Sequence, residues 1–373
     1  MSPGESPCFE SPVGPEVQVD GQRLLWFGGT AYLGLQARPE VIAAAVAAIQ
    51  RFGLHPGSAR AGYGTTPPLL AAEAEAAEFF GTAAALHVAS GWAATALLVA
   101  ALPTRRWRAF HDEHAHASAR EALGLLDATP RHPYAHGDAG DLAARLQREL
   151  KAGETPLVVT DGVFAGNGRL APLAALREAL APYPGGTLLV DDAHGFGVLG
   201  ENGRGSVEHA GLADDDALLV AGTASKALGG HGALVAGNAE RIARIARASA
   251  WSAGSTPPTV PVAAATAAAL RIARTEPLLR VRLHAHAETL RAGLRALGVT
   301  LRDDARAAPI IALSLPRERE VDALHVALRR AGILVPVLKG YGGLTAPALR
   351  IAVFATHEAA HLEALLDALR RHL

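Results

Sequence analysis

Short apolar runs alternate with longer amphipathic stretches through the first two thirds of the chain. The runs lie at residues 84–88, 156–159, 187–190, 217–220 and 233–235, and stretches with helical spacing separate them. Runs that are apolar throughout are typical of strands buried on both faces, as in a mainly parallel sheet covered by helices on each side. The pattern therefore predicts an α/β fold.

The N-terminal part of the chain predicts an arm, a hairpin and a helix. Residues 1–15 are rich in Pro, Ser and Gly, which is typical of a flexible arm without a packing pattern. Residues 17–27 predict a short extended pair that turns at Asp20-Gly21. A helix is expected over 39–53, because proline is favoured in a first helical turn and glycine after a last one.

From residue 257 the chain changes to long helices rich in Ala, Leu and Arg. The spacing predicts helices over 257–273 and 277–297, strands over 309–315 and 349–354, and a final helix from about residue 357. This order is typical of a smaller α+β domain. The predicted division of the chain is an N-terminal arm (1–38), a large domain (39–256) and a small C-terminal domain (257–373).

Length, charge and cysteine content narrow the possible function classes. The chain has 373 residues, half of them apolar, so it can bury a large core. Its 35 basic and 36 acidic residues leave a net charge of −1, so no excess field attracts nucleic acid or an anionic membrane. Without a signal-peptide pattern or a run of roughly 18 apolar residues, we expect a soluble, cytoplasmic protein with a small-molecule partner. The one cysteine, Cys8, cannot form a disulfide framework.

Lysine is rare in this chain. Only three of the 35 basic residues are lysines, and Lys226 follows shortly after the apolar run 217–220. An amine that loses its proton can form an imine with an aldehyde, whereas a guanidinium effectively stays protonated. Lys226 is therefore a candidate for covalent chemistry, while Lys151 and Lys339 lie in polar loop sequences and are interpreted as surface charges.

Polar residues follow three of the predicted strands, at the edge where ligands bind in open α/β sheets. A carboxylate at the end of a buried strand is costly unless a cation faces it. The protonated nitrogen of a pyridine ring would serve at Asp191, although a turn cap without any ligand is the competing interpretation. The three strand-end sequences are Asp191-Asp192-Ala193-His194 after 187–190, the segment to Lys226 after 217–220, and 111–118 after 106–110.

Two further motifs have competing interpretations. Residues 195–200 match a dinucleotide fingerprint, but 201–205 cannot open the helix that would hold a pyrophosphate, so a glycine-rich loop is predicted. Ser90-Gly91-Trp92 precedes a helical stretch, and its amides would suit a phosphate or form a plain turn. The paired Asp191-Asp192 could belong to an ATPase, but the sequence has no G-x-x-x-x-G-K-[ST] loop.

A histidine cluster supports a hypothesis of a different class, a metal-dependent hydrolase. His111, His114 and His116, with Asp112, would be one ligand set, and the segment 191–194 would be a second. No second His-x-x-x-His signature supports these ligands, and loop histidines are common in a chain with 16 of them. Metal binding is therefore the remote alternative.

Four motifs together resemble those of the α-oxoamine synthase family. They are 116–118 (HAS), 191–195 (DDAHG), 200–205 (GENGRG) and 223–226 (TASK), and the spacing from Asp191 to Lys226 also fits. The family consists of pyridoxal 5'-phosphate enzymes of the aspartate-aminotransferase fold, fold type I, and includes 8-amino-7-oxononanoate synthase and glycine C-acetyltransferase. The resemblance covers nearly the whole chain. It implies a large domain with a mainly parallel seven-stranded sheet, a smaller C-terminal domain and a homodimer.

The resemblance also implies a reaction and a function for each motif residue. Lys226 would form an imine with pyridoxal 5'-phosphate and later remove the α-proton of a small amino acid. That amino acid would condense with an acyl thioester of CoA or a carrier protein and lose carbon dioxide, giving an α-amino ketone; an aminotransferase is the alternative. The other implied contacts are Asp191 with the ring nitrogen, His194 with the ring hydroxyl, His116 and Ala193 with the ring faces, Thr223, Ser225 and the amides of Gly91 and Trp92 with the phosphate, and Arg350 with a substrate carboxylate.

The sequence departs from the family's pattern at positions that the resemblance places around the substrate. Thr30 stands where an Asn that contacts the amino-acid carboxylate is usual, and 165–168 (AGNG) replaces Ser-Met-Asp-Gly. These changes leave the amino acid, the acyl donor and the choice between acyl transfer and amino transfer open. The remaining departures are Leu69 for His, Thr95 for Asn, and Gly254 for a Thr that reaches the neighbouring subunit's phosphate.

Overall fold

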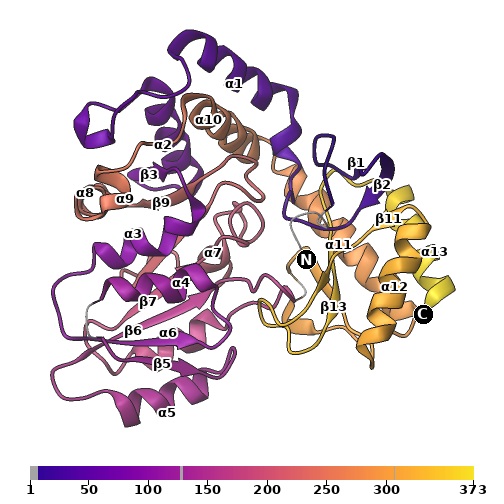
Figure 1. The fold of residues 1–373 in the computed structure, drawn as a ribbon. Coiled ribbons are helices and arrows are strands. Elements are labelled where there is room, and N and C mark those ends of the chain that lie inside the picture. The colour runs from indigo at the N-terminus through magenta and orange to yellow at the C-terminus, as the bar shows by residue number, and fades with distance from the viewer. Residues whose placement is uncertain (1–6, 127–128, 306) are drawn as a thin grey trace.

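The computed structural model describes residues 7–126, 129–305 and 307–373, and the chain forms a larger and a smaller lobe (Figure 1). The larger lobe is built on a seven-stranded sheet in which β9 is antiparallel to its two neighbours and all the other neighbouring strands are parallel. The predicted mainly parallel sheet is therefore confirmed. In spatial order its strands are β3 (Ala84–Val88), β9 (Ala233–Gly237), β8 (Leu218–Thr223), β7 (Thr187–Asp191), β6 (Thr155–Asp161), β4 (Trp107–Asp112) and β5 (Arg131–Tyr134).

The edge strand β5 was not predicted from the apolar pattern. Its sequence is Arg-His-Pro-Tyr, and only Tyr134 is fully buried. An edge strand has one neighbour and need not be apolar throughout, so the signal that reveals the central strands is absent there. By contrast, each of the five apolar runs from 84–88 to 233–235 coincides with a strand of this sheet, except that Ala217 precedes β8.

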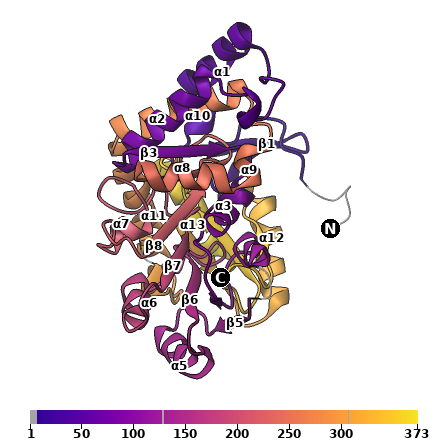
Figure 2. The ribbon, with the colours of Figure 1, turned by 90° about the vertical axis from the view of Figure 1, so that its left-hand side faces the viewer.

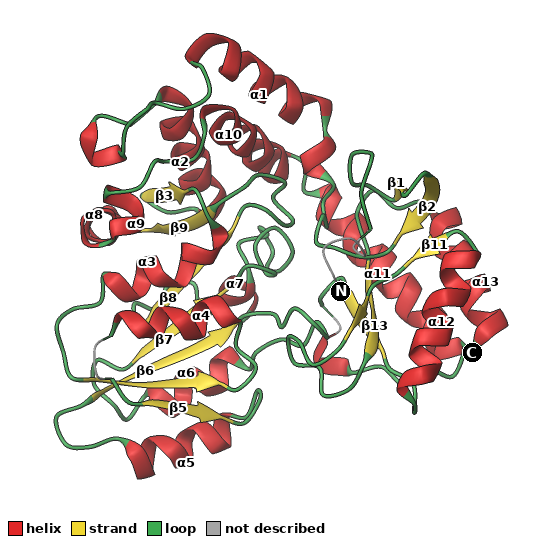
Figure 3. Cartoon of the chain, in the orientation of Figure 1, coloured by secondary structure: helices red, strands yellow, loops and turns green. Residues whose placement is uncertain are grey.

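Helices cover both faces of the sheet (Figure 3). Side chains alternate along each strand, so Leu157 and Leu189 pack into one apolar cluster while Val158 and Leu188 pack into another. This alternation also decides which face each strand-end residue occupies. The first face is covered by α3 (Ala94–Ala100), α4 (Ala117–Ala122) and α8 (Ala239–Ala248), and the second by α5 (Ala139–Glu149), α6 (Leu173–Leu180) and α7 (Ser206–His209).

Three helices pack together at the far end of the larger lobe, beside β3 (Figure 2). They are α1 (Pro39–Phe52), α2 (Pro67–Phe80) and α10 (Val260–Thr275). Helix α1 has the predicted ends, with Pro39 in its first turn and Gly53 following at a φ of 76°. Because α10 packs on α1 and α2, the chain beyond residue 257 first returns to the larger lobe; the predicted domain boundaries stay a prediction. The short α9 (Ala250–Ala253) precedes α10.

The smaller lobe contains two three-stranded sheets and three helices. The sheet orders are β1-β2-β11 and β10-β13-β12. Within the three described ranges, no helix combines the length and the apolar content needed to cross a bilayer. The strands are β1 (Glu16–Val19), β2 (Gln22–Trp26), β10 (Ile310–Leu313), β11 (Ile333–Leu334), β12 (Val337–Leu338) and β13 (Ala348–Ala352), and the helices are α11 (Leu278–Ala296), α12 (Glu318–Arg330) and α13 (Ala359–His372).

The N-terminal segment confirms one prediction and corrects another. The hairpin turns at Asp20 and Gly21, both with positive φ, as the sequence predicted. A flexible arm was predicted over 1–15. Residues 1–6 lie outside the described residues, and for 7–15 the prediction of a segment without packing is wrong. Phe9 forms a β-bridge with Val19 and packs edge-on against Trp26 at 5.2 Å, because the open edge of β1 and an apolar ring give this segment partners.

Candidate active site

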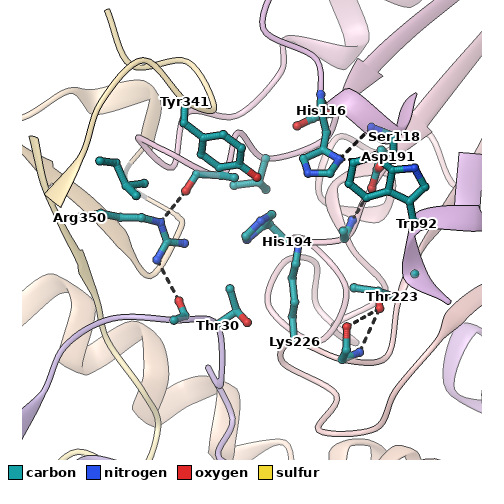
Figure 4. A pocket seen from close by; sticks show the side chains of 18 of the residues that line it. Thr30, Trp92, His116, Ser118, Asp191, His194, Thr223, Lys226, Tyr341 and Arg350 are labelled. Carbon is teal, nitrogen blue, oxygen red and sulfur yellow. Dashed lines mark hydrogen bonds between the residues drawn. The ribbon is translucent and has the colours of Figure 1, made fainter. Parts of the chain in front are cut away.

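A cavity of about 580 Å³ lies where the carboxyl ends of the central strands face the smaller lobe (Figure 4). Both lobes contribute side chains to it, so the site depends on how the lobes meet. All the residues that the sequence analysis singled out for catalysis, cofactor binding or substrate binding line this one cavity. They are Thr30, Gly91, Trp92, His116, Asp191, Ala193, His194, Thr223, Ser225, Lys226 and Arg350.

Two carboxyl groups stand side by side at the strand ends. Asp161 of β6 and Asp191 of β7 are register partners, and side-chain alternation turns both toward the face covered by α3 and α4. Burial raises the pKa of Asp161 well above its ordinary value, and the charge of Asp191 adds to this effect. Two like charges so close in a buried site are costly, so the raised pKa favours the protonated form of Asp161.

Lys226 follows β8 and points toward the part of the cavity where His194 and Asp191 lie (Figure 4). Burial lowers the pKa of its amine from 10.5 to about 8, although the charges of Asp191 and Asp161 act in the opposite direction. A substantial fraction of the amine is therefore neutral near neutral pH, which a solvated lysine is not. Only a neutral amine is a nucleophile or a base, so Lys226 can perform both functions.

His116 is held in one orientation at the N-terminus of α4. Its backbone N–H donates to Asp161 Oδ1 at 2.9 Å, and its ring Nδ1 accepts from the Ser118 N–H at 3.3 Å. The proton of the neutral ring is therefore on Nε2. Trp92 meets the ring edge-on with centroids 5.3 Å apart, and burial lowers the pKa of His116, which favours the neutral ring.

One end of the cavity is lined by hydroxyl groups and tightly packed backbone. Thr223 Oγ1 and Ser225 Oγ lie 2.6 Å apart, and the Ser225 N–H donates to Thr223 Oγ1 at 3.1 Å. A β-carbon on Gly91 would lie 2.7 Å from Thr223 Oγ1, so a glycine is required for this close approach. Hydroxyl and amide groups gathered in this way suit the oxygens of a phosphate.

A chain of hydrogen bonds joins the two lobes across the opposite end. Arg350 of β13 donates through Nη2 to Tyr32 Oη at 3.2 Å, and Tyr32 Oη bonds His194 Nδ1 at 2.8 Å. Arg350 also donates through Nε to Ala165 O and through Nη1 to Gly29 O, so two of its five N–H groups remain for a ligand. Burial and the Lys226 charge lower the pKa of His194 well below its ordinary value, so its ring is neutral.

The sequence analysis missed several residues that line the cavity. Asp161 had a visible signal, because it follows the apolar run 156–159 just as Asp191 follows 187–190. Tyr341 had only its glycine neighbours as a signal, and Tyr32, which lies behind the cavity, had none. The other missed lining residues are Gly29, Val163, Pro336 and Leu338.

The departures from the family's pattern do not all lie at the cavity. Thr30 and Ala165 line it, as expected for residues around a substrate. Leu69 and Thr95 are fully buried in α2 and α3, and neither is part of the lining. Gly254 follows α9 and is also outside the lining of this chain. Within one subunit, therefore, fewer of the residues that differ from the family's pattern lie around the substrate than the sequence indicated.

The two competing motifs have plain structural explanations. Residues 195–200 form turns, and the next helix, α7, begins only at Ser206, so no helix follows the glycine pattern directly. Asp112 accepts hydrogen bonds from the His114 N–H and from His136 Nδ1, at 2.8 and 3.0 Å. In the part of the chain that the structure describes, no three His, Cys, Asp or Glu residues are grouped so as to hold a metal ion.

The chain is similar to known proteins over nearly its whole length. The family model "Aminotransferase class I and II" matches residues 22–369. A curated relative, the 8-amino-7-oxononanoate synthase of Pseudomonas aeruginosa, is 40% identical over 369 residues, which cover 98% of this chain and 90% of the relative.

Solved structures of serine palmitoyltransferases share the fold of this chain. The enzyme from S. paucimobilis, solved with a bound PLP–myriocin compound, aligns with a TM-score of 0.91 and 26% identity. The Sphingomonas wittichii enzyme aligns with a TM-score of 0.91 and 27% identity. Each alignment covers 98% of this chain and 92% of the solved chain. The predicted aspartate-aminotransferase-like fold is thereby confirmed.

Proposed function

The chain belongs to the aminotransferase class I and II family, and we propose that it is a pyridoxal 5'-phosphate enzyme of the α-oxoamine synthase type. It condenses a small amino acid with an acyl thioester and releases carbon dioxide, giving an α-amino ketone. The observation that carries this proposal is the meeting of a buried lysine of lowered pKa with the strand-end residue Asp191 in one cavity. The likeness to 8-amino-7-oxononanoate synthase over nearly the whole chain supports the same reaction.

The residues present fit this cofactor. Lys226 is the amine that would bind it covalently, and Asp191 supplies the negative charge for a protonated ring nitrogen. The close packing of Gly91 on Thr223, with Ser225 beside it, leaves the hydroxyl-lined end for the phosphate. When bound, the cofactor withdraws electrons from the α-carbon of an attached amino acid. His116 and Ala193 would contact the two ring faces, with the Trp92 amide at the phosphate and His194 at the ring hydroxyl.

The chain's own residues would orient the substrate and move its proton. Arg350 presents two free N–H groups to the cavity, which suits the bidentate geometry of an amino-acid carboxylate. Thr30 lines the cavity near Gly29, whose carbonyl holds Arg350 in place. Lys226, once its amine is released, is the base that takes the α-proton. On this basis we propose Arg350 and Thr30 as contacts of the substrate.

The proposal is tested by following thiol and carbon dioxide release. Purified protein loaded with pyridoxal 5'-phosphate is mixed with glycine, alanine or serine and with acyl-CoA thioesters of different chain length, and the product mass is recorded. We expect thiol and carbon dioxide in equal amounts and a product of α-amino ketone mass. Transfer of the amino group to the cofactor without thiol release would support the aminotransferase instead. Removal of metal ions with a chelator should leave this acyl transfer unchanged. The activity of a metal-dependent hydrolase would be lost after the same treatment.

The lowered pKa of Lys226 predicts a distinctive pH dependence of cofactor capture. Protein freed of cofactor is mixed with pyridoxal 5'-phosphate, and the visible absorption of the product is followed over time. Because only the neutral amine reacts, the rate should rise about tenfold per pH unit below pH 8 and level off above it. A rate that kept rising up to the ordinary lysine value of 10.5 would contradict the lowered pKa.

We propose that the protein is a homodimer that uses the exposed face of α1. Ile42, Val46 and Ile49 recur at helical spacing and are 40 to 48% exposed, while the opposite face packs on α10. Three exposed apolar side chains in a row on one helix face fit a contact with a second copy of the chain. The choice of CoA or carrier protein and the cytoplasmic location stay predictions.

Replacing Val46 with glutamate should therefore shift the dimer toward monomer. The new charges would be buried in the interface, where they lack a partner. Light scattering coupled to size-exclusion chromatography measures the mass. Val326 on α12 is similarly exposed, at 46% against 48%, so Val326→Glu is the control and should leave the mass unchanged. A monomeric native protein, or an unaltered mass of Val46→Glu, would refute this assignment.

A further inference from the structure

A glycine-rich loop of the smaller lobe brings a tyrosine to the cavity. Residues 339–343 read Lys-Gly-Tyr-Gly-Gly, and Tyr341 lines the cavity together with Pro336 and Leu338 from the same lobe. Gly340, Gly342 and Gly343 all have positive φ, at 63°, 58° and 87°. Residues with side chains rarely adopt this conformation, so the path of the loop around Tyr341 depends on its glycines.

The larger lobe is shaped to receive this loop. The Gly166 N–H donates to Gly342 O at 2.9 Å, and Asn167 Nδ2 donates to Gly343 O at 2.9 Å. A β-carbon on Gly166 would collide with the backbone oxygens of Tyr341 and Gly342. The family's pattern places a methionine at position 166, and its side chain would collide with the loop in the same way. The glycine at 166 and the tyrosine loop therefore depend on each other.

The Tyr341 hydroxyl is available to a ligand. Its side chain points into the cavity from the side of Arg350, toward His116 and His194 (Figure 4), and its ring meets His116 edge-on at 6.2 Å. Among the described residues, none forms a hydrogen bond with this hydroxyl, whereas Tyr32 bonds both Arg350 and His194. Burial raises the pKa of Tyr341, and the charges of Asp161 and Asp191 act in the same direction, so the phenol keeps its proton.

Several other polar groups of the cavity already have a partner in the proposed function. Arg350 binds the amino-acid carboxylate, Asp191 and His194 bind the cofactor ring, and the Thr223 end binds the phosphate. The group left without a donor is the carbonyl oxygen of the acyl donor. That oxygen must lie close to the α-carbon that attacks it, inside the cavity into which the Tyr341 hydroxyl points from the side of Arg350.

We propose that Tyr341 binds the acyl donor by donating a hydrogen bond to its thioester carbonyl oxygen. This inference rests on the proposed function. When the α-carbon bonds to the carbonyl carbon, the electron pair of the C=O bond moves to oxygen, and it returns as the C–S bond breaks and the thiolate leaves. The Tyr341 hydroxyl keeps its proton throughout and stabilises the charge that develops on the oxygen.

The experiment compares Tyr341→Phe with the native protein loaded with pyridoxal 5'-phosphate. We expect kcat/KM for the acyl thioester, measured by thiol release, to fall between about tenfold and a hundredfold, since one donor to a developing oxyanion is lost. Calorimetry measures how tightly each protein binds a non-reactive thioether or ketone analogue of the acyl donor. Comparing this affinity with kcat/KM separates the effect of the substitution on donor binding from its effect on turnover. Cofactor absorption and the exchange of the amino-acid α-proton with solvent, measured without acyl donor, should stay within about twofold.

Two controls make the outcome specific. Tyr183→Phe removes a hydroxyl outside the cavity lining and should change none of these values. Gly166→Ala should displace the loop and lower the donor kcat/KM as Tyr341→Phe does. An unchanged donor kcat/KM in Tyr341→Phe, or an equal loss of α-proton exchange, would overturn the inference. If the native protein exchanges the α-proton but releases no thiol with any donor, the proposed acyl transfer itself fails, and this inference fails with it.

Discussion

Lys226→Ala is expected to lose all turnover and the visible absorption of the cofactor-bound protein. The amine is the one lysine of the cavity, and its lowered pKa lets it act as nucleophile and as base near neutral pH. Alanine can do neither, and no other lysine lines the site. Visible spectra after incubation with pyridoxal 5'-phosphate and desalting test the covalent bond, and thiol release tests the turnover.

Lys151→Ala is the matched control, because Lys151 lies in an exposed turn far from the cavity lining. This variant should match the native protein in colour, melting temperature and rate. Circular dichroism and thermal unfolding of Lys226→Ala should also be native-like, since losing a buried amine removes a desolvation cost. Retained colour or turnover in Lys226→Ala would refute the assignment of this amine.

Asp191→Asn is expected to slow exchange of the amino-acid α-proton by several orders of magnitude while covalent cofactor binding persists. In the proposed function the carboxylate would keep a proton on the pyridine nitrogen, which an amide could not do, so the ring would withdraw electrons less strongly. Each 1.36 kcal/mol of lost transition-state stabilisation slows the step about tenfold. Proton NMR of glycine or alanine in deuterated water measures the exchange without any acyl donor.

Asp161→Asn provides the contrast for Asp191. The two residues are register partners in one sheet and line the same cavity, so the substitutions are close in position. Burial raises the pKa of Asp161 and favours its neutral form, so an amide there removes less charge than at Asp191. The expected change in exchange rate is therefore far smaller. Equal effects of the two substitutions would show that Asp191 is not the group that faces the ring nitrogen.

The central sheet was predictable from sequence because burial on both faces leaves an unambiguous apolar pattern. The runs 187–190 and 217–220 have no polar residues to mark a solvated face, and each lies in a central strand. Features that depend on long-range pairing were not predictable in this way. Strand β5 is half exposed at the edge, and Phe9 is ordered by a partner strand and by Trp26, neither of which is near it in sequence.

The candidate site was predictable to the extent that it follows strand ends and motifs. Lys226, Asp191, His194 and His116 were found because polar residues after buried strands converge at one edge of a parallel sheet. Tyr341 and Ala165 come together only through the contact between the lobes, and no local pattern encodes that contact. Leu69 and Thr95 looked like substrate contacts by position, but their helices turn these side chains into the interior.

The hydrogen-bond chain from Arg350 through Tyr32 to His194 links a side chain of the smaller lobe to a side chain of the larger one. Tyr32 Oη accepts a hydrogen bond from the Arg350 guanidinium and forms another with the His194 ring. A change at Arg350 therefore alters the polarity of the Tyr32 hydroxyl and the strength of its hydrogen bond with His194. A carboxylate bound at Arg350 would therefore change the hydrogen bonding of the His194 ring, even if no atom of the ligand touched that ring. In this way a ligand contact made by the smaller lobe would alter a side chain of the larger one.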